Sequence, residues 1–420
     1  MGKEITPDYI CKIEGHGSLD INFKDSRAKL NIHEGERLFE GLLMKRLPND
    51  APFITARICG ICPTVHYLTA ICALENALGI KISQETEILR KILLAGQIIQ
   101  SHTLHLYFLA LPDYLNLDSG LDLFKAYPAE FHIALNLKKF ADRTIELIGG
   151  RAVHPITPQI TGFDKIPSVK DLNLLLEEAK NVLDDASQTV ALFAQLSYPE
   201  LEHPTEFLSL SPKEKKYPFY NSDGINSSLN KNFATVDYDR EIEEIVKSYS
   251  TAKFSLKEGK GFMVGALARL NLNKDLLNPG AKDLIKKLKI KIPSYNPFHN
   301  NLAQAIEILH FLEEIINLIK TISSLDLEKA QTFNFPLKKG YGVAACEAPR
   351  GTLYHAYTLD ENGLIKKCNI ITPTAQNLTS IEEAANILLA QTKNLSNKKR
   401  QHLLEMLIRA YDPCITCSVH

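Results

Sequence analysis

Arg57-Ile58-Cys59-Gly60-Ile61-Cys62-Pro63-Thr64-Val65-His66 and Asp412-Pro413-Cys414-Ile415-Thr416-Cys417-Ser418-Val419-His420 each contain a Cys-x-x-Cys pair. Cys62 and Cys414 lie 352 positions apart, whereas a zinc ribbon keeps both pairs within a few tens of residues. A shared metal would therefore require the whole fold to close around it. Four thiolates form a soft donor set that suits Zn, Fe or Ni. Spacing alone favours metal binding, while separate redox dithiols and purely structural cysteines stay open.

Composition excludes several classes of protein. The chain has 420 residues, with 48 Lys plus Arg against 49 Asp plus Glu, so a nucleic-acid partner has no electrostatic basis. Hydrophobic residues at 45% and charged residues at 23% exclude general disorder. Eight cysteines are too few for a disulfide framework. Those outside the two pairs are expected to be buried small hydrophobes, namely Cys11, Cys72, Cys346 and Cys368.

Two features bear on localisation. Residues 1–5 lack the apolar run of a secretory signal, so a cytoplasmic protein is expected. Residues 92–112 carry no Asp, Glu, Lys or Arg and nearly reach the length of a membrane span. Polar side chains are dense in the middle of this segment, which is costly in hydrocarbon. We therefore expect a buried helix and no membrane span.

Apolar periodicity predicts one domain over residues 1–420, mainly α with peripheral β (α+β), with a core of long bundled helices. Helices are expected over residues 64–78, 85–111, 121–148, 169–196, 301–324, 381–392 and 398–410. A β-hairpin is expected from residues 11–23 and 28–32, and a second β segment over residues 340–371, turning at residues 360–363. Residues 202–237 are rich in Pro, Ser, Asn and Lys and predict an irregular surface excursion.

Gly340-Tyr341-Gly342-Val343-Ala344-Ala345 matches the letters of a dinucleotide-binding fingerprint. That site needs a helix N-terminus whose amides meet the pyrophosphate. Pro349 and Gly351 follow within a β-rich stretch, so glycines in a hairpin are the favoured interpretation. No P-loop and no Gly-x-Ser-x-Gly elbow occur in the sequence.

The residues around the two cysteine pairs resemble the cysteine boxes of the nickel-iron hydrogenase large subunit. The resemblance covers essentially the whole chain. Within the family, the chain is most similar to the soluble, cytoplasmic branch, which includes sulfhydrogenases and NADP-reducing hydrogenases. Four further boxes follow in the family's order: Ile13-Glu14-Gly15-His16-Gly17, Arg37-Leu38-Phe39-Glu40, Glu347-Ala348-Pro349-Arg350-Gly351 and Ile371-Thr372-Pro373-Thr374. The resemblance implies that family's fold, a helical core with N-terminal and C-terminal β-hairpin elements.

The same resemblance implies a nickel-iron centre. Cys59 and Cys414 match terminal nickel ligands, and Cys62 and Cys417 match the ligands that bridge nickel to iron. The iron would carry one carbon monoxide and two cyanides, and dihydrogen would bind at an open position between the metals.

A second metal and a processing step are also implied. Glu40, His420 and the backbone carbonyl of Ile370 match the ligands of a magnesium (or iron) ion. Family members commonly lose a short extension after the box histidine, so a chain that ends at His420 is expected to be the mature form.

Further residues match catalytic positions. Arg350 would reach over the open position, Cys414 would accept the first proton, Glu14 would pass it on, and Asp412 belongs to the same set. Ser101 stands where membrane-associated members often carry an Asp. The implied pocket around the diatomic ligands, with His66 beside a bridging sulfur, consists of His66, Ala348, Pro349, Arg350, Leu353, Thr372, Pro373 and Thr374.

The resemblance therefore implies the catalytic subunit of a soluble hydrogenase, which interconverts dihydrogen with protons and electrons. A subunit of an electron-bifurcating or coenzyme-reducing complex, a hydrogen-sensing scaffold and a tetrathiolate zinc protein stay open. An iron–sulfur cluster needs about four cysteines, and the remaining four show no ligand spacing. Electrons must then pass to an iron–sulfur small subunit, and onward to flavin or iron–sulfur subunits that react with NAD(P) or ferredoxin. We expect the helix over residues 85–111, with His102 and His105, to form the docking face, in an interface above ~1,600 Å².

Overall fold

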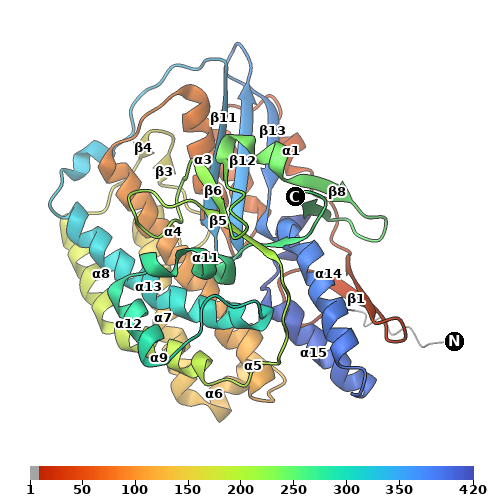
Figure 1. The fold of residues 1–420 in the computed structure, drawn as a ribbon. Coiled ribbons are helices and arrows are strands. Elements are labelled where there is room, and N and C mark those ends of the chain that lie inside the picture. The colour runs from red at the N-terminus through yellow and green to blue at the C-terminus, as the bar shows by residue number, and fades with distance from the viewer. Residues whose placement is uncertain (1–8) are drawn as a thin grey trace.

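Long helices make up much of the molecule, as the sequence predicts, and most of them lie together in one bundle (Figure 1). The computed structural model describes residues 9–420, so residues 1–5, which bear on localisation, lie outside the described residues. The long helices are α3 (Pro63–Leu78), α4 (Gln84–Leu104), α7 (Pro128–Gly149), α8 (Val169–Asn181), α9 (Leu183–Ala194), α13 (Asn300–Ile322), α14 (Pro373–Gln391) and α15 (Asn397–Ala410). The shorter helices are α1 (Phe39–Leu42), α2 (Asp50–Thr55), α5 (Leu111–Tyr114), α6 (Leu123–Ala126), α10 (Tyr238–Glu241), α11 (Ala266–Asn273), α12 (Pro279–Lys287) and α16 (Ile415–Ser418).

Helix α4 lies at the centre of the bundle, packed against α7 and α13, while α13 also contacts α8 and α9. Helix α4 begins after Ser83, whose side chain caps the helix by accepting a hydrogen bond from the Thr86 amide. Apolar side chains face several neighbours, so most residues of α4 and α13 are buried. Each fully buried Leu or Ile stabilises the fold by about 1.5–3 kcal/mol relative to exposure. Among residues 9–420, no helix combines the length and the apolar character of a membrane span.

Three of the expected helices are interrupted. The helix expected over residues 121–148 breaks before Pro128, which begins α7, because proline disfavours a helical residue ahead of it. The helix over residues 169–196 divides at Val182, and Asp184 and Asp185 favour a new N-terminus there. The helix over residues 85–111 changes to a π-helical segment, η2 (His105–Ala110). Such segments often occur at functional sites.

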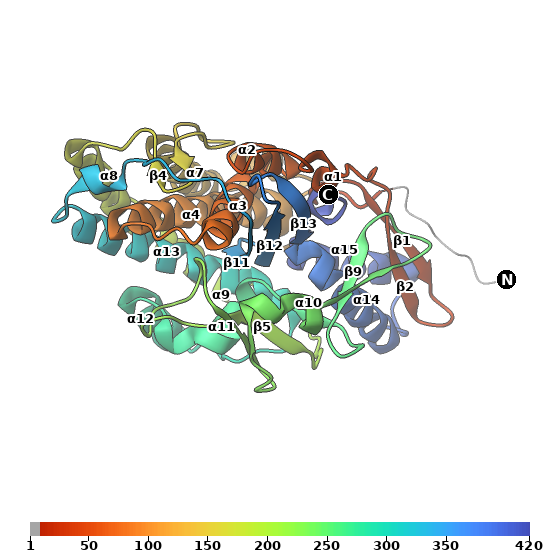
Figure 2. The same ribbon diagram turned by 90° about the horizontal axis from the view of Figure 1, so that it is seen from above.

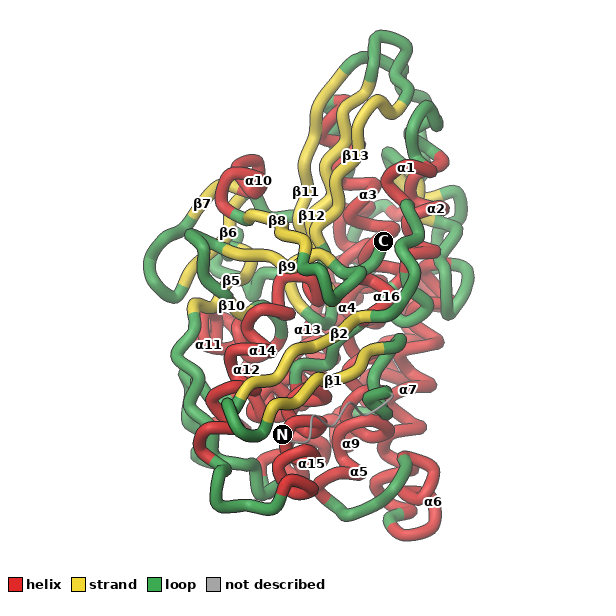
Figure 3. Tube along the Cα trace, turned by 90° about the vertical axis from the view of Figure 1, so that its right-hand side faces the viewer, coloured by secondary structure: helices red, strands yellow, loops and turns green. Residues whose placement is uncertain are grey.

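Within residues 9–420 the strands form five small sheets, and the larger ones lie beside the helices rather than among them (Figure 3). The hairpin expected near the N-terminus forms from β1 (Gly17–Asn22) and β2 (Arg27–Ile32). The C-terminal β segment is a three-stranded antiparallel sheet of β11 (Gly340–Ala348), β12 (Gly351–Leu359) and β13 (Ile365–Ile371), with the expected turn at residues 360–363. The other strands are β3 (Pro158–Gln159), β4 (Gly162–Phe163), β5 (Glu206–Leu210), β6 (Gly224–Ser227), β7 (Phe233–Ala234), β8 (Glu243–Val246), β9 (Lys253–Leu256) and β10 (Phe262–Met263).

The sheet of β11, β12 and β13 is more deeply buried than the expected peripheral hairpin, because β11 and β12 pack against α3. A side chain at Gly342 would place its Cβ 2.2 Å from the Ala73 carbonyl oxygen, so glycine permits this close contact. Residues 340–345, which match the dinucleotide-binding fingerprint, therefore belong to strand β11 of a hairpin, as the favoured interpretation predicted. Mainly α structure with small sheets is confirmed, whereas the division into domains stays a prediction.

Two expectations are wrong. Residues 202–237 are not irregular throughout, because β5, β6 and β7 pair there in a sheet with β10, and Phe219 is buried in the main core. The Pro- and Lys-rich loops between these strands produced the irregular composition. Cys11 is exposed rather than buried, because it lies in the open segment before β1, while Cys72, Cys346 and Cys368 are buried as expected.

Candidate active site

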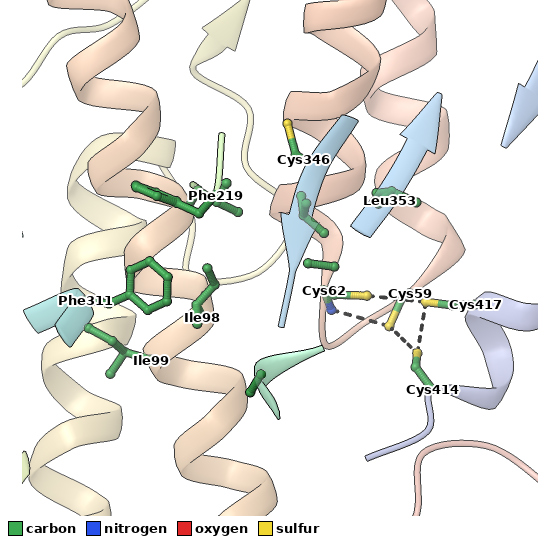
Figure 4. Packing of buried hydrophobic residues seen from close by; sticks show 14 of the residues in the cluster. Cys59, Cys62, Ile98, Ile99, Phe219, Phe311, Cys346, Leu353, Cys414 and Cys417 are labelled. Carbon is green, nitrogen blue, oxygen red and sulfur yellow. Dashed lines mark hydrogen bonds between the residues drawn. The ribbon is translucent and has the colours of Figure 1, made fainter. Parts of the chain in front are cut away.

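The four paired cysteines converge on one point, although they come from opposite ends of the chain (Figure 4). All four Sγ atoms lie within 4.8 Å of one another, and the side chains are 1–3% exposed. The Cys59 and Cys414 sulfurs are 3.2 Å apart, those of Cys62 and Cys417 are 3.3 Å apart, and those of Cys414 and Cys417 are 2.9 Å apart. The cysteines are free thiols, so the cluster offers a tetrathiolate donor set.

Local structure aims these sulfurs inward. Cys59 lies in an extended turn ahead of α3, and the amides of Ile61 and Cys62 point at its sulfur over 3.2 and 3.4 Å. On the other side, the Cys414 amide donates to Thr374 Oγ1 at 2.9 Å. Amides directed at sulfur stabilise a thiolate, which is the form that binds metal.

Arg37 joins the two cysteine segments. Its Nη2 group donates to the Ile58 carbonyl at 2.7 Å and also to the Thr416 carbonyl, and its backbone amide donates to the Val419 carbonyl at 3.1 Å. A planar guanidinium can hold two carbonyls at once in fixed geometry. The C-terminal segment is thereby fixed beside the Cys59 segment.

The cluster cannot easily hold four negative charges by itself. Hydrogen bonds from Cys414 and Cys417 lower the pKa of Cys59, whereas burial raises the pKa of Cys414 and of Cys417. A bound cation would offset this repulsion and release the thiol protons. The donor set and its charge therefore fit a buried, thiolate-bound metal centre.

Glu14 lies against this cluster. The Cys414 thiol donates to Glu14 Oε2 at 3.1 Å, and the Thr416 amide donates to the same oxygen at 3.1 Å. The Ile415 amide donates to the Glu14 carbonyl at 3.0 Å, so backbone pairing fixes this contact. Gly15 adopts φ +84°, and a Cβ there would lie 2.7 Å from the Ile415 Cβ. The glycine in the Ile-Glu-Gly-His-Gly box therefore permits the close approach.

Arg350 and Asp412 form a buried ion pair at the edge of the cluster. Arg350 Nε and Nη2 donate to Asp412 Oδ1 at 3.1 and 2.7 Å, and Nη1 donates to Ser101 Oγ at 3.4 Å. Burial opposes the charge of Arg350, but Asp412 and the site cysteines raise its pKa, so it stays cationic. Asp412 has φ +51°, an unfavourable conformation ahead of Pro413. The contacts of Asp412 with Arg350 stabilise this unfavourable backbone conformation.

A small cavity of about 10 Å³ lies beside three of the four cysteines, Cys62, Cys414 and Cys417. Its lining, mostly apolar on the side away from the sulfurs, comprises Cys62, His66, Ala348, Pro349, Arg350, Leu353, Pro373, Thr374, Cys414 and Cys417. Thr372, which we expected in this pocket, is buried at the N-cap position of α14 but is not among the residues that line the cavity, and its hydroxyl makes no capping hydrogen bond. Thr374 Oγ1 accepts from the Cys414 amide, which leaves its hydroxyl hydrogen free to donate.

His66 begins a buried chain of polar side chains. Its Nε2 lies 3.6 Å from Cys417 Sγ, and its Nδ1 lies 3.2 Å from His355 Nε2. His355 Nδ1 in turn lies 3.0 Å from Tyr357 Oη. Burial lowers the pKa of His66 to about 3, so the imidazole is neutral. His355 was not expected at the site, although its period-2 spacing from Leu353 on one strand is a usable sequence signal.

Glu40, Ile370 and His420 also come together, at the other side of the C-terminal segment. Glu40 Oε1 accepts from the Ile370 amide at 2.7 Å, and His420 Nε2 lies 2.7 Å from the Ile370 carbonyl oxygen. Figure 2 shows the C-terminus beside α1 and β13, which carry the other two residues. The carboxylate and the imidazole thus meet the backbone of the same residue, and together with its carbonyl they form a donor set suited to a divalent ion.

The expected docking face is wrong. His102 and His105 are 0% and 2% exposed, because α4 and η2 are enclosed by other helices. His102 Nε2 contacts Glu307 Oε2 at 2.8 Å, and His105 Nδ1 contacts Gln304 Oε1 at 2.5 Å. Both histidines therefore make buried contacts between helices and are not available to a docking partner.

Comparisons with known proteins agree with this geometry. The sequence model of the family described as Nickel-dependent hydrogenase matches residues 37–139 and 211–420, more than half of the chain. The chain is 39% identical to Sulfhydrogenase 1 subunit alpha of Pyrococcus furiosus, over 99% of this chain and 97% of that relative. It is 27% identical to NAD-reducing hydrogenase HoxS subunit beta of Cupriavidus necator, over 100% of this chain and 95% of that protein. The crystal structure of an NAD+-reducing [NiFe]-hydrogenase in the H2-reduced state superposes with a TM-score of 0.87 and 26% identity, covering 100% and 99% of the two chains.

Proposed function

The chain belongs to the nickel-dependent hydrogenase family, and we propose that it is the catalytic subunit that converts dihydrogen reversibly into two protons and two electrons. One observation carries this proposal. Four buried thiols meet within 4.8 Å, with a carboxylate 3.1 Å from one of them and a guanidinium lining the same cavity. This arrangement combines a soft metal site, a proton acceptor and a fixed positive charge.

The proposed cofactor is a nickel-iron centre whose iron carries one carbon monoxide and two cyanides. Cys59 and Cys414 would bind nickel, while Cys62 and Cys417 would bridge nickel to iron. The diatomic ligands would lie in the pocket, mostly against Ala348, Pro349, Leu353 and Pro373, where the polar donors are Arg350 and Thr374. When bound, such a centre supplies a soft Lewis acid that polarises dihydrogen for heterolytic cleavage.

The residues of this chain supply the rest of the chemistry. The Cys414 sulfur accepts the first proton and passes it to Glu14 Oε2, 3.1 Å away. Arg350, held by Asp412, directs positive charge at the position where negative charge develops. The apolar pocket wall excludes water and so strengthens this interaction.

We propose that Glu40, His420 and the Ile370 carbonyl bind a magnesium (or iron) ion. In support, Glu40 and His420 both contact the backbone of Ile370, Glu40 at the amide and His420 at the carbonyl oxygen. The ion would link α1, β13 and the C-terminal residue, and would thereby stabilise the segment that carries Cys414 and Cys417.

The proposed partner is an iron–sulfur subunit, which passes electrons on to NAD(P) or another soluble carrier. Arg57 and Gly60 are exposed, so the chain segment around Cys59 reaches the surface. Next to it, exposed apolar side chains lie on α1, α2 and the loops that border a 730 Å³ surface cavity, namely Leu38, Leu42, Leu47, Phe53 and Phe333. Exposed apolar surface beside a buried redox site supports docking of an electron-transfer subunit at this face. The cytoplasmic location stays a prediction.

The test of the proposed function is metal content and spectroscopy. Purified with its partner, the chain should contain nickel and iron and show infrared bands of carbon monoxide and cyanide. It should also reduce an electron acceptor with dihydrogen. Zinc without nickel would instead identify a structural tetrathiolate protein, because zinc has no redox chemistry.

Glu14→Gln is expected to retain both metals but to slow hydrogen oxidation by about 10²–10⁴-fold, since the amide is nearly isosteric yet cannot carry the proton. The measurement is hydrogen-dependent dye reduction together with nickel content. Glu34→Gln is the matched control, because Glu34 is also half-buried in the N-terminal segment but hydrogen-bonds His16 instead of a site cysteine. Parent rates in Glu14→Gln would remove Glu14 from the mechanism.

A further inference from the structure

Arg269 on α11 is a fully buried arginine that touches neither the cysteines nor the cavity, yet all of its donor atoms are engaged. Nε and Nη2 donate to Glu307 Oε1 and Oε2, both at 2.6 Å. Nη1 donates to Glu347 Oε2 at 2.9 Å. The remaining hydrogen bonds go to backbone carbonyls: Nη1 to Ala348 at 3.0 Å and Nη2 to Pro349 at 3.1 Å. These two carbonyls belong to the residues immediately before Arg350.

Arg269 therefore binds the turn that carries Arg350 through the backbone of the two preceding residues. On its other side, Gly265 stands so close that a Cβ would lie 3.0 Å from the Arg350 carbonyl oxygen. Asp412 orients the guanidinium end of Arg350, through its side chain and through its backbone carbonyl, which accepts from Nε at 2.7 Å. The backbone of Arg350 lies between the paired residues Ala348 and Gly351, and Arg269 binds the two carbonyls that precede it.

Helices α4 and α13 support both ends of Arg350. On α13, Glu307 binds Arg269, and Gln304, one turn earlier, donates to Asp412 Oδ2 at 3.0 Å. On the facing chain segment, His102 contacts Glu307, and His105 contacts Gln304. Residues three positions apart lie on the same face of a helix. His102 and His105 therefore face Glu307 and Gln304 as two neighbouring pairs.

The buried charges are consistent with a rigid unit. Burial opposes ionisation of Glu307, but Arg269 and His102 outweigh it and lower the pKa of this carboxyl, which also accepts a hydrogen bond from Tyr217 at 2.8 Å. Burial raises the pKa of Glu347, although Arg269 acts against this shift. A buried bidentate pair with all donors satisfied tolerates little displacement, because any movement leaves charges unpaired.

We propose that Arg269 is a positioning residue for hydrogen activation, and that it sets the place of the Arg350 guanidinium through the Ala348 and Pro349 carbonyls. This inference rests on the proposed function, because Arg350 is assigned its role there. The sequence has no motif around Arg269 that would predict it.

The test is Arg269→Lys in the complete hydrogenase, with its partner. Lysine keeps the charge but has three donors on one nitrogen, so it cannot bind Glu307 bidentately and reach both carbonyls. We expect nickel to be retained, the cyanide and carbon monoxide infrared bands to shift, and kcat to fall about 10–100-fold with little change in KM.

Arg90→Lys is the matched control. Arg90 is also fully buried and binds Glu75 through both Nη atoms, at 2.8 and 2.7 Å, as well as the Gln159 carbonyl, but it contacts no residue of the Arg350 turn. Both variants should unfold at a lower temperature than the parent. Only Arg269→Lys should change the infrared bands.

Unshifted bands and parent kcat in Arg269→Lys would overturn the proposal, as would equal band shifts in Arg90→Lys. If Arg269→Lys does not fold, Glu307→Gln tests the same contact, because the amide keeps the shape and loses the charge that holds Arg269. Parent bands and kcat there would also overturn it. Failure of the proposed function is separate, since it would show as missing nickel or missing bands in the parent protein.

Discussion

Cys414→Ser is expected to lose nickel and to lower hydrogen turnover by more than about 100-fold. Serine replaces a soft, ionisable thiolate by a hydroxyl that stays protonated at neutral pH and binds soft metals poorly. Even residues that only support metal ligands cost up to about 100-fold when replaced, so loss of a ligand should cost more. The substitution also removes the group that donates to Glu14 Oε2.

Nickel by elemental analysis and hydrogen-dependent dye reduction are the two measurements. Cys346→Ser is the control, because Cys346 is equally buried but lies outside the four-cysteine cluster. It should keep nickel and activity. Full nickel stoichiometry together with normal turnover in Cys414→Ser would falsify the ligand assignment.

Arg350→Lys is expected to assemble the metal centre but to lower kcat by about 10²–10³-fold, the size of effect seen when one fixed donor is removed from a charge-stabilising site. A lysine ammonium keeps the positive charge opposite Asp412 but loses the planar group that binds Asp412 through two nitrogens. It cannot pair with Asp412 and also direct a second donor into the cavity.

Infrared spectra separate this effect from loss of the cofactor. Carbon monoxide and cyanide bands should remain in Arg350→Lys, shifted in frequency, with nickel at the parent level. Normal turnover in Arg350→Lys would show that the guanidinium has no part in hydrogen activation. The Arg90→Lys protein again reports the effect of disturbing a buried arginine elsewhere in the core.

Local sequence patterns predict the helices well where capping residues and apolar spacing agree. The helix expected over residues 64–78 is α3, begun by Pro63 and ended by Gly79 with φ +68°. The interrupted helices show the limit of such patterns. Pro128 was visible in the sequence, whereas no local pattern indicates the long-range contacts that His105 makes at the start of the π-helical segment, with Gln304 and the Arg409 carbonyl.

The sequence by itself determined the donor set of the site, because thiol chemistry depends on residue type and because Cys59, Cys62, Cys414 and Cys417 stand in recognisable boxes. The Ile-Glu-Gly-His-Gly box also identified Glu14 as a candidate proton relay, and the structure places its carboxylate 3.1 Å from the Cys414 sulfur.

Only the tertiary structure decided which polar residues are buried and which partners they contact. His102 and His105 look like surface residues of an apolar helix, but their partners lie about 200 positions away on α13. Arg269 carries no local signal, since an arginine is ordinarily exposed unless a carboxylate distant in sequence is brought beside it. Burial of a polar group is stable only when long-range partners complete its hydrogen bonds, and those partners are fixed by the packing of the whole chain.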